Sequence, residues 1–434
     1  MRLDCAHNFA PKAQNSTLAR RYVCFRSAEP PDNMDFHFIS PCGAKLYEVY
    51  DIRDGGMPFV NIVFTCGGTG GHIYPAIAVA RLFEQRQPGC NILFIGAEDG
   101  MENKIVPREG FRLETLKISN FQRKLTPSAI AHNIETAAHL AESRRKVHKI
   151  LTEFRPNIVI GTGGYASFPA LREGARLSIP TMVHESNAVP GLTTRMVEKY
   201  MDRIMVSFED SRSSYHDPKK VVVTGTPVRE EFLYTRRQAA REKLGLDERP
   251  FIVSCWGSLG AREMNKKIAE FMKCEAEAGE PFQHLHATGS FGWRWMPQYV
   301  KDLGLDLSKH PAIDMREYIF NMPTAMAAAD LIICRAGAAT ISEVCASALP
   351  CIMVPSPNVT NNHQEKNAMV LQGRGAAVVV PEAGCSGKLL FDTAREILAD
   401  TERTKSMRQA ASSLAVVDSA QRIYETALEL MQSR

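Results

Sequence analysis

The amino-acid sequence predicts an α/β protein made of two doubly wound, Rossmann-like domains that face each other across a cleft. Short apolar runs alternate with helix-like stretches twice, first from Phe59 to about Val228 and again from Phe251 onward. Each half opens with an apolar run that leads into a glycine-rich turn and then a helical pattern. Strands separated by helices in this way form parallel βαβ units with helices on both faces of the sheet. The 434 residues are enough for two or three domains, because single cores stop growing near about 250–300 residues.

Bulk composition narrows the class of protein. Hydrophobic residues make up 44% of the chain and charged residues 23%, which is ordinary for a soluble globular enzyme. The net charge of +4 is too small to indicate a nucleic-acid partner, and no apolar run approaches the ~18 residues that a membrane span needs. The eleven cysteines form no Cys-x-x-Cys pair, so the sequence indicates neither a zinc site nor a disulfide framework. Reduced, mostly buried cysteines in a cytosolic protein fit this pattern best.

The first 56 residues differ from the rest of the chain. They mix Pro, Asn, Asp and Arg with short apolar segments, show no sustained period and lack the apolar core of a secretory signal. We predict that residues 1–56 are a poorly ordered appendage or a start-site artefact, and that the folded enzyme begins near Met57. A polar stretch over 233–250 marks a second boundary. We therefore expect one domain over 57–228 and another over 229–434, with the last helix packing back on the first domain.

Eight short apolar runs carry the strand prediction. They are rich in branched or aromatic side chains, and polar or glycine-rich loops follow most of them. Because ligands bind at the carboxyl ends of strands in open parallel sheets, these loops are the candidate sites. The runs are Val60–Cys66, Asn91–Gly96, Ile158–Gly161, Thr181–Val183, Arg203–Val206, Phe251–Cys255, Leu331–Cys334 and Leu349–Pro355.

The loop Gly67-Gly68-Thr69-Gly70-Gly71-His72 is the most informative of these. It joins the first apolar run to a helical pattern, with Pro75 suited to the first helical turn. This geometry places bare N–H groups and a positive helix end against an anion, and His72 brings a titratable group to the same place. A nicotinamide fingerprint would need glycine at Ile73, and a P-loop would need Gly-Lys-Ser/Thr; neither is present. A plain tight turn, with His72 as a polar cap, remains the alternative.

The segment from Cys334 to Glu343 repeats this arrangement in the second half. A helix N-terminus here could hold a diphosphate, and Glu343 would accept hydrogen bonds from vicinal sugar hydroxyls. The spacing of Thr340 and Glu343 also fits a capping box, which needs no ligand. Both readings stay open, but they are separable, because a capping Glu bends back onto its own helix whereas a ribose ligand points outward.

Three further loops carry polar groups. Gly161–Tyr165 precedes a helix opened by Pro169 and is another candidate anion cradle. His184–Gly191 follows a strand and has four polar side chains, which is unusual for a plain connection. The amides of Asn358–Ala368 could bind the hydroxyls of a neutral sugar, although a solvated helix start with Asn caps is locally the favoured explanation.

Residues 121–155 form a basic amphipathic stretch. A basic surface of this kind suits contact with anionic lipid headgroups. An ordinary packed helix with a solvated face explains the pattern equally well. The apolar positions are Ile130, Ile134, Ala137, Ala141, Val147, Ile150 and Leu151, and the basic ones are Arg123, Lys124, Arg144, Arg145, Lys146 and Lys149.

In this order, the motifs resemble the MurG family of peripheral-membrane N-acetylglucosaminyltransferases of peptidoglycan synthesis. The resemblance runs from about Phe59 to about Gln432 and does not cover residues 1–56. Any one motif is weak, but the ordered set is highly specific. Trp256 departs from the family pattern, which often has glycine there, and this affects the local shape of the donor loop. The motifs are Gly67–Pro75, Gly161–Tyr165, His184–Asn187, Val223–Arg229, Gly257–Ala261, Arg335–Glu343 and His363-Gln364.

The resemblance implies a two-domain GT-B fold and an inverting glycosyltransferase. The implied donor is UDP-N-acetylglucosamine (UDP-GlcNAc), bound mainly by the second domain. The implied acceptor is lipid I, the N-acetylmuramyl-pentapeptide on undecaprenyl diphosphate, and the product is lipid II. The resemblance also implies peripheral attachment to the cytoplasmic face of an anionic cell membrane, a part in cell shape and division, and other cell-wall synthesis proteins as partners. No cofactor or metal is implied, and the sequence has no Asp-x-Asp pair.

The resemblance further implies a role for each site residue. His72 is the candidate base, because imidazole titrates near neutrality and an acceptor hydroxyl is a poor nucleophile until it loses its proton. Helix N-termini and Arg229 could stabilise the charge on the departing UDP without a metal. In the implied site, the cleft is lined by Thr69, Gly70 and Gly71, and the transferred sugar is contacted by Asn187 and Gln364. The uracil is met by the backbone of Ile319, and the ribose by Glu343. The phosphates are held by Arg229, Ser258 and the turn of Ala338, Ala339, Thr340, Ile341 and Ser342.

Two alternatives stay open at this point. Another GT-B enzyme, such as a UDP-sugar epimerase or a transferase acting on diacylglycerol lipids, would share the architecture. A non-catalytic UDP-sugar-binding protein that recruits cell-wall machinery would share the donor motifs. His72 is the residue that separates catalysis from binding alone.

Overall fold

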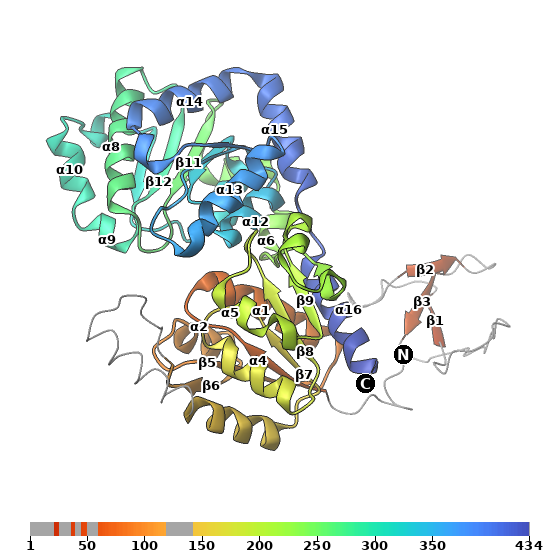
Figure 1. Ribbon diagram of the computed structural model, residues 1–434. Helices are drawn as coiled ribbons and strands as arrows, with labels where there is room; N and C mark the ends of the chain where they lie inside the picture. The colour runs from red at the N-terminus through yellow and green to blue at the C-terminus, as the bar shows by residue number, and fades with distance from the viewer. Residues whose placement is uncertain (1–20, 26–35, 40–44, 50–59, 119–141, 434) are drawn as a thin grey trace, which may run out of the picture. The chain divides into compact units, whose positions relative to one another are not determined.

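The computed structural model describes residues 21–25, 36–39, 45–49, 60–118 and 142–433 (Figure 1). The chain divides into two compact units, Met1–Phe59 and Val60–Arg434. In the first unit, three strands form an antiparallel sheet in the order β1-β3-β2. Most of residues 1–56 lies outside the described ranges, so their disorder stays a prediction. The three strands are β1 (Arg21–Phe25), β2 (Phe36–Ile39) and β3 (Lys45–Val49).

The second unit begins with a sheet of seven parallel strands in the order β10-β9-β8-β7-β4-β5-β6. Successive residues of β4 (Asn61–Thr65), an interior strand of this sheet, pack on opposite faces, because side chains alternate along a strand. Phe64 packs with α1 and α16, while Val63 packs with α4 and the helix at 142–154. The strands are β4 (Asn61–Thr65), β5 (Asn91–Ala97), β6 (Arg112–Leu116), β7 (Ile158–Gly161), β8 (Thr181–Glu185), β9 (Arg203–Val206) and β10 (Val221–Val223).

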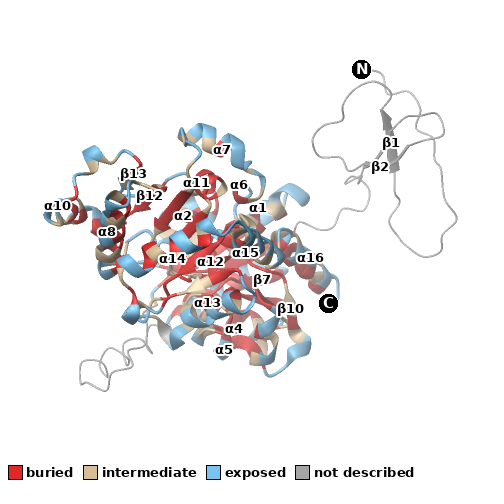
Figure 2. Ribbon diagram, turned by 90° about the horizontal axis from the view of Figure 1, so that it is seen from above, coloured by how far each residue is buried: buried red, intermediate tan, exposed pale blue. Residues whose placement is uncertain are grey.

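A second sheet of six parallel strands follows in the order β13-β12-β11-β14-β15-β16. Two apolar clusters cover its two faces, so this sheet is doubly wound as well. In Figure 2 the buried residues, in red, lie in the interior of the second unit, and many residues of its outer helices are pale blue. The strands are β11 (Phe251–Cys255), β12 (Gln283–Ala287), β13 (Ile313–Arg316), β14 (Leu331–Cys334), β15 (Cys351–Met353) and β16 (Ala377–Val379).

The helices of the second unit connect these strands. The last one, α16, packs on α1, and Figure 1 shows it beside the first sheet. The α-helices are α1 (Gly70–Arg86), α2 (Glu102–Arg108), α4 (Ser167–Arg176), α5 (Leu192–Val197), α6 (Glu231–Tyr234), α7 (Arg237–Leu244), α8 (Arg262–Glu277), α9 (Ser290–Trp293), α10 (Met296–Asp302), α11 (Met322–Ala328), α12 (Ala338–Ala346), α13 (His363–Gly373), α14 (Gly387–Ala399), α15 (Thr401–Ser413) and α16 (Ser419–Gln432). Short 3-10 helices are η1 (Glu198–Tyr200), η2 (Glu209–Ser214), η3 (Pro218–Lys220), η4 (Leu307–Lys309), η5 (Thr360–Asn362) and η6 (Glu382–Gly384).

The strand orders locate the ligand-binding ends of both sheets. In the first sheet the order reverses between β4 and β7, and in the second between β11 and β14. Ligands of doubly wound folds bind at such switch points, beyond the carboxyl ends of the strands. The loop from Gly67 and the loop from Gly161 therefore flank one switch point, and the loops from Trp256 and Arg335 flank the other.

The predicted fold class is confirmed, with two corrections of detail. All eight predicted runs contain a strand, but β6, β10, β12, β13 and β16 were not predicted. Helix α1 begins at Gly70, so Pro75 lies inside the helix and not in its first turn. The proline ring there approaches the carbonyl four residues back, which belongs to Gly71, the residue type that leaves most room.

Candidate active site

The loop from Gly67 turns β4 into α1 and presents the first turn of that helix. Its N-cap is Thr69, in an extended conformation, and the Thr69 hydroxyl makes no capping bond to its own helix. Both Thr69 and the turn are therefore available to a ligand at the positive end of the helix dipole. A Cβ placed on Gly71 would lie 3.7 Å from the Ala339 Cβ of α12. The starts of α1 and α12 thus face each other at close range.

His72 is the third residue of α1, and its ring is held by the backbone of a distant loop. The Nδ1 atom lies 3.0 Å from the carbonyl oxygen of Thr162. In return, the Thr162 hydroxyl donates to the His72 carbonyl at 2.6 Å. A carbonyl oxygen can only accept, so Nδ1 carries the proton and Nε2 carries the lone pair. This tautomer is the one that a general base needs at Nε2.

Glycines allow this close approach of the two loops. Gly163 has φ +107°, and a Cβ on it would lie 2.5 Å from His72 Nδ1. Gly164 has φ +83°, and its Cβ would lie 2.2 Å from the carbonyl oxygen of Gly67. Any larger residue would push the two loops apart. Packing against the first loop therefore accounts for these glycines of the Gly161–Tyr165 loop without a bound anion.

The surroundings of His72 lower its pKa below the ordinary 6.5. Burial is the largest cause, because it disfavours the charged ring. The Glu185 carboxylate and the Thr162 carbonyl act in the opposite direction, and His363 of α13 adds to the lowering. The ring is therefore neutral near pH 7, ready to accept a proton, with a carboxylate close enough to favour the imidazolium once it forms.

The loop after β8 is organised by the buried carboxylate of Glu185. Its Oε1 accepts from the Asn187 backbone N–H at 3.1 Å and from Asn187 Nδ2 at 2.8 Å. Its Oε2 accepts from Gly191 N at 2.8 Å and from the Thr194 hydroxyl at 2.7 Å. Four donors on one carboxylate explain why this loop has so many polar residues. The side chain of Asn187 is thereby fixed on one side.

Asn367 of α13 holds Asn187 from the other side. The Asn367 Nδ2 atom donates to Asn187 Oδ1 at 3.1 Å, and Asn367 Oδ1 accepts from Ala188 N at 2.7 Å. Asn367 is fully buried and also donates to the Ala336 carbonyl before α12. A sugar contact by Asn187 would therefore add to a side chain that is already oriented. We did not predict Asn367, although it lies three residues after Gln364, on the same face of a helix.

The capping-box alternative for the second glycine turn is wrong. Helix α12 has Gly337 as its N-cap and no side-chain capping bond. Thr340 is consequently the third helical residue and Glu343 lies a further turn along. The predicted phosphate-binding residues Ala338, Ala339, Thr340, Ile341 and Ser342 form the first turns of α12, whose N-terminal end faces α1.

Glu343 is a buried carboxyl with an unusual pKa. Burial raises its pKa from 4.5 to about 7, and the nearby Arg229 guanidinium acts in the opposite direction. Arg229 is itself exposed and its guanidinium lies 5.1 Å from the centre of the Phe232 ring. The structure thus brings Arg229 and Glu343 close enough to interact electrostatically.

The remaining predicted residues lie at the same edge of the second sheet. Ser258 is exposed in the turn after β11, and its carbonyl accepts from Ser290 N at 3.2 Å. Ile319 follows β13 with its side chain in the core, so only its backbone is suited to meet a base. Gln364 begins α13, and its Oε1 accepts from Ser356 N at 2.9 Å. No contact joins these three directly to His72.

Two other local sequence features can be compared with the structure: the Asn-rich start of α13 and Trp256. Helix α13 has the exposed Asn362 as its N-cap, as the Asn-cap explanation expects, but in the left-handed conformation and without a side-chain capping bond. Trp256 is buried in the core beside the Arg335 guanidinium, which lies 5.7 Å from the ring centre. A core tryptophan thus fills the position of the family's glycine, while Gly257 keeps the turn itself, at φ +84°.

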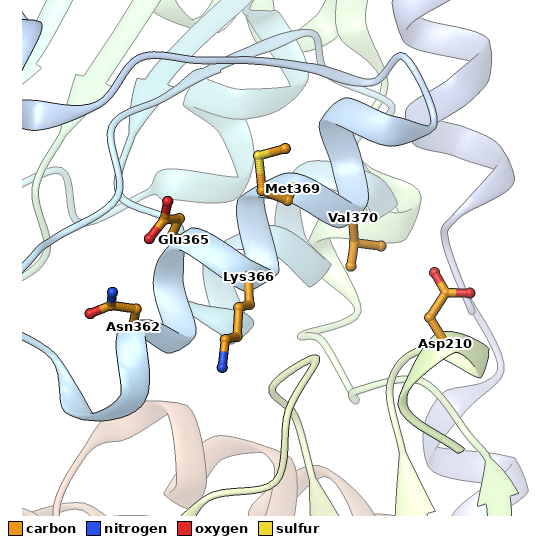
Figure 3. A pocket seen from close by; sticks show the side chains of 6 residues that line it. All are labelled: Asp210, Asn362, Glu365, Lys366, Met369 and Val370. Atoms are coloured by element: carbon orange, nitrogen blue, oxygen red, sulfur yellow. The ribbon is translucent and has the colours of Figure 1, made fainter. Parts of the chain in front are cut away.

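The largest pocket that we describe lies beside α13 and has a volume of about 580 Å³ (Figure 3). Asp210 of η2 faces α13 across it, and the Asn358–Ala368 segment contributes Asn362, Glu365 and Lys366 to its lining. Its lining residues are Asp210, Asn362, Glu365, Lys366, Met369 and Val370.

Part of the basic stretch falls on residues 119–141, outside the described ranges. In the described part, Val147 and Leu151 are buried against the sheet, and Arg145 and Lys149 are exposed. This half is a packed helix with a solvated basic face. Among the described residues, no helix is long and apolar enough to cross a membrane. Within the same ranges, no group of three or more His, Cys, Asp or Glu is placed to hold a metal ion.

Comparison with known proteins identifies the family. The glycosyltransferase family 28 N-terminal domain matches residues 62–206, and the C-terminal domain of that family matches 252–423. A UDP-N-acetylglucosamine--N-acetylmuramyl-(pentapeptide) pyrophosphoryl-undecaprenol N-acetylglucosamine transferase from Acetivibrio thermocellus is 39% identical over 376 residues, which cover 86% of this chain and 99% of the relative.

Solved structures with the same fold do not all share one activity. The crystal structure of Acinetobacter baumannii MurG matches with a TM-score of 0.67 and 24% identity, over 85% of this chain and 99% of that one. A UDP-GlcNAc 2-epimerase from Neisseria meningitidis matches with a TM-score of 0.57 and 16% identity, over 85% of this chain and 99% of that one. The fold is therefore shared more widely than the reaction, and sequence identity carries the assignment. On that identity, the chain belongs to the MurG family of N-acetylglucosamine transferases, within glycosyltransferase family 28.

Proposed function

We propose that this transferase moves N-acetylglucosamine from UDP-GlcNAc to the 4-hydroxyl of the N-acetylmuramyl group of lipid I, with inversion at the anomeric carbon. The observation that carries the proposal is the tautomer of His72, which commits Nδ1 to Thr162 and leaves the lone pair on Nε2. This base lies on the turn of α1 that faces the start of α12. The name of the relative supplies the donor and the acceptor.

The reaction follows from these groups. The acceptor hydroxyl attacks the anomeric carbon while His72 Nε2 takes its proton, and the bond from that carbon to the UDP oxygen breaks with its electron pair leaving on UDP. The Glu185 carboxylate favours the imidazolium that results. Arg229 and the N-terminal turn of α12 would stabilise the diphosphate as its negative charge grows.

The donor would lie along the edge of the second sheet. In this arrangement the backbone of Ile319 meets the uracil, Glu343 accepts from the ribose hydroxyls, and Ser258 contacts the phosphates. Gln364 and Asn187 would contact the transferred sugar from opposite sides. The burial of Glu343 supports its role, because a buried carboxylate that gains two hydroxyl donors recovers part of the hydration it lost.

We also propose that the enzyme attaches peripherally to the cytoplasmic face of an anionic membrane, where lipid I is held and other cell-wall synthesis proteins act. The exposed Arg145 and Lys149 on the helix at 142–154 support this. Co-sedimentation with phosphatidylglycerol vesicles and with phosphatidylcholine vesicles would test it. Binding that requires phosphatidylglycerol and weakens with salt is expected, and equal binding to both would contradict the electrostatic basis.

The experiment that tests the function is transfer of labelled N-acetylglucosamine from UDP-GlcNAc to a lipid I analogue in the presence of EDTA. Labelled lipid product would support donor, acceptor class and metal independence together. UDP release without lipid product would mean another acceptor or hydrolysis, and conversion of the donor alone would mean an epimerase. Donor binding without any turnover would favour a binding protein. Neither binding nor turnover would contradict the proposal altogether.

A further inference from the structure

We propose that Glu102, at the start of α2, is a positioning residue for this transfer: its buried carboxylate fixes the Gly67-Gly68 turn that carries His72 and sets a negative charge behind the imidazole. The inference rests on the proposed function for its role in catalysis. Its geometric part concerns only the first sheet and its loops. Neither the sequence motifs nor the predicted site included this residue.

The carboxylate of Glu102 is completely buried, with 0% of the residue exposed. Its Oε1 accepts from the backbone N–H of Ala97 at 2.7 Å, at the end of β5. Its Oε2 accepts from the backbone N–H of Gly68 at 3.2 Å, in the turn before α1. Burying a carboxylate is costly unless hydrogen bonds or paired charges offset the hydration that it loses. Here it ties the ends of two neighbouring strands together.

Three glycines, one in the turn before α1 and two shortly before Glu102 itself, leave room for this carboxylate. A Cβ on Gly67 would lie 2.8 Å from Glu102 Oε1, and one on Gly96 would lie 2.5 Å from its Cγ. A Cβ on Gly100 would lie 2.2 Å from both carboxylate oxygens. These positions have no space for any other residue while Glu102 is present. The segment Gly96-x-x-x-Gly100-x-Glu102 therefore encodes a cavity of the size of one carboxylate.

The Gly67-Gly68 turn connects the position of Glu102 to that of His72. Gly68 has φ +88° and leads through Thr69 into the first turn of α1, which ends in His72. The carbonyl of Gly67 packs closely against Gly164, and the neighbouring Gly163 packs against the His72 ring. Glu102 thus fixes one side of the turn, and the loop from Gly161 fixes the other. Releasing Gly68 would let the start of α1 move relative to Thr162.

The charge of Glu102 also acts electrostatically on the His72 imidazole. The groups that face His72 are Glu185 and His184 of β8, His363 of α13, the Thr162 carbonyl and Glu102. Burial and His363 lower the His72 pKa, whereas Glu185, Thr162 and Glu102 raise it. Removing the Glu102 charge should therefore lower the pKa further and weaken Nε2 as a base, without removing any group that touches substrate.

The test compares Glu102→Gln with the wild-type enzyme and with Glu173→Gln. Glu173 of α4 is another buried carboxylate of the first domain, paired with Arg144, His148 and Arg176, so it controls for the loss of buried charge. The first readout is NMR titration of ¹³C-labelled histidine, with His72→Ala to assign the resonance. The second is the pH profile of kcat/KM for transfer to the lipid I analogue.

In Glu102→Gln we expect the His72 titration and the acid limb of kcat/KM to move to lower pH by roughly half to one unit. We expect kcat to fall about tenfold, because the base is weaker and less well held, with the KM for UDP-GlcNAc unchanged. Glu173→Gln should leave the His72 titration in place. An unchanged His72 titration in folded Glu102→Gln, or an equal shift in Glu173→Gln, would overturn the inference.

A second variant keeps the test decisive if Glu102→Gln does not fold. Glu102→Asp retains the charge but shortens the reach to Gly68, so it should keep the His72 titration within about 0.3 units and still lower kcat. A wild-type kcat in this variant would overturn the positioning role. If the wild-type enzyme transfers no sugar at all, the proposed function fails, whereas the titration shift still decides whether Glu102 acts on His72.

Discussion

At the scale of single residues, the hydrogen bond from His72 to Thr162 determines the chemistry of the site. One carbonyl oxygen selects the tautomer, and burial keeps the ring neutral. The sequence could predict His72, because it stands beside glycines after a strand. It could not predict Thr162, which is 90 residues away and acts through its backbone. Asn187 and Asn367 are 180 residues apart, and only the fold brings them together.

Replacing His72 by Ala should separate catalysis from binding. Transfer should fall by about 10²-fold or more, because a positioned general base contributes at least that much. The affinity for UDP-GlcNAc, measured by calorimetry, should stay close to that of the wild type, because the proposed donor site lies on the second sheet. Unaffected transfer would remove His72 from the mechanism.

Glu343 should make donor binding depend on pH. With a pKa of about 7, the carboxyl ionises as the pH rises, and in the proposed site the ionised form accepts hydrogen bonds from the ribose. KM for UDP-GlcNAc should therefore fall by up to about tenfold between about pH 6 and about pH 8. The dependence should disappear in Glu343→Gln. A KM that rises with pH in the wild type would contradict the role.

Glu343 should also make the stability of the folded protein depend on pH. Stability should fall as the pH rises, whereas donor binding should improve. The folded-state pKa of about 7 lies above the ordinary 4.5, so the folded protein holds this proton more tightly than the unfolded chain. The contribution of Glu343 to stability is present below pH 4.5 and is lost as the pH rises through about 7. The melting temperature of Glu343→Gln should not show this loss of stability as the pH rises. A melting temperature difference between the two proteins that does not change with pH would contradict it.

At the scale of elements, the strands that could be predicted are those with uninterrupted apolar residues. Strand β12 reads Gln-His-Leu-His-Ala and was missed, because His284 and His286 do not look like core residues. In the fold both are buried, and each ring hydrogen-bonds to Ser254 at 2.7 Å. Glu275 completes the network at 2.8 Å from His284. Polar partners from another strand and a helix make these histidines acceptable in a core, and sequence periodicity does not contain that information.

The glycine loop of residues 161–165 should be intolerant of a single methyl group. In Gly163→Ala the added Cβ would lie 2.5 Å from His72 Nδ1, at a backbone φ of +107°. We expect transfer to fall about 10- to 100-fold, because a displacement of this size misplaces the base. Gly110→Ala is the matched control: its φ is +81° and nothing lies within 4 Å of the new Cβ.

That control should lose only about 1–2 kcal/mol of stability, which is the cost of a left-handed conformation for alanine. Its transfer activity should remain that of the wild type. Comparable losses of activity in the two variants would mean that backbone strain, and not the contact with His72, is responsible.

At the scale of the whole molecule, the chain divides after Phe59. Both parallel sheets and their apolar clusters lie in Val60–Arg434. A protein lacking residues 1–59 should therefore unfold at the same temperature as the full chain and transfer sugar at the same rate. Calorimetry and the transfer assay measure the two quantities. An insoluble or inactive truncated protein would show that the first unit is needed.

The return of α16 to the first sheet has a consequence for how the protein is made. Tyr424 of α16 packs on Phe83 of α1, with ring centres 4.7 Å apart, and Ile423, Ala427 and Leu430 join the same cluster. A ribosome synthesises the first half long before these residues emerge. The part of this apolar cluster that α16 covers therefore stays exposed until Ser419–Gln432 has been synthesised. Translation that stops early leaves this surface open to aggregation and to chaperones.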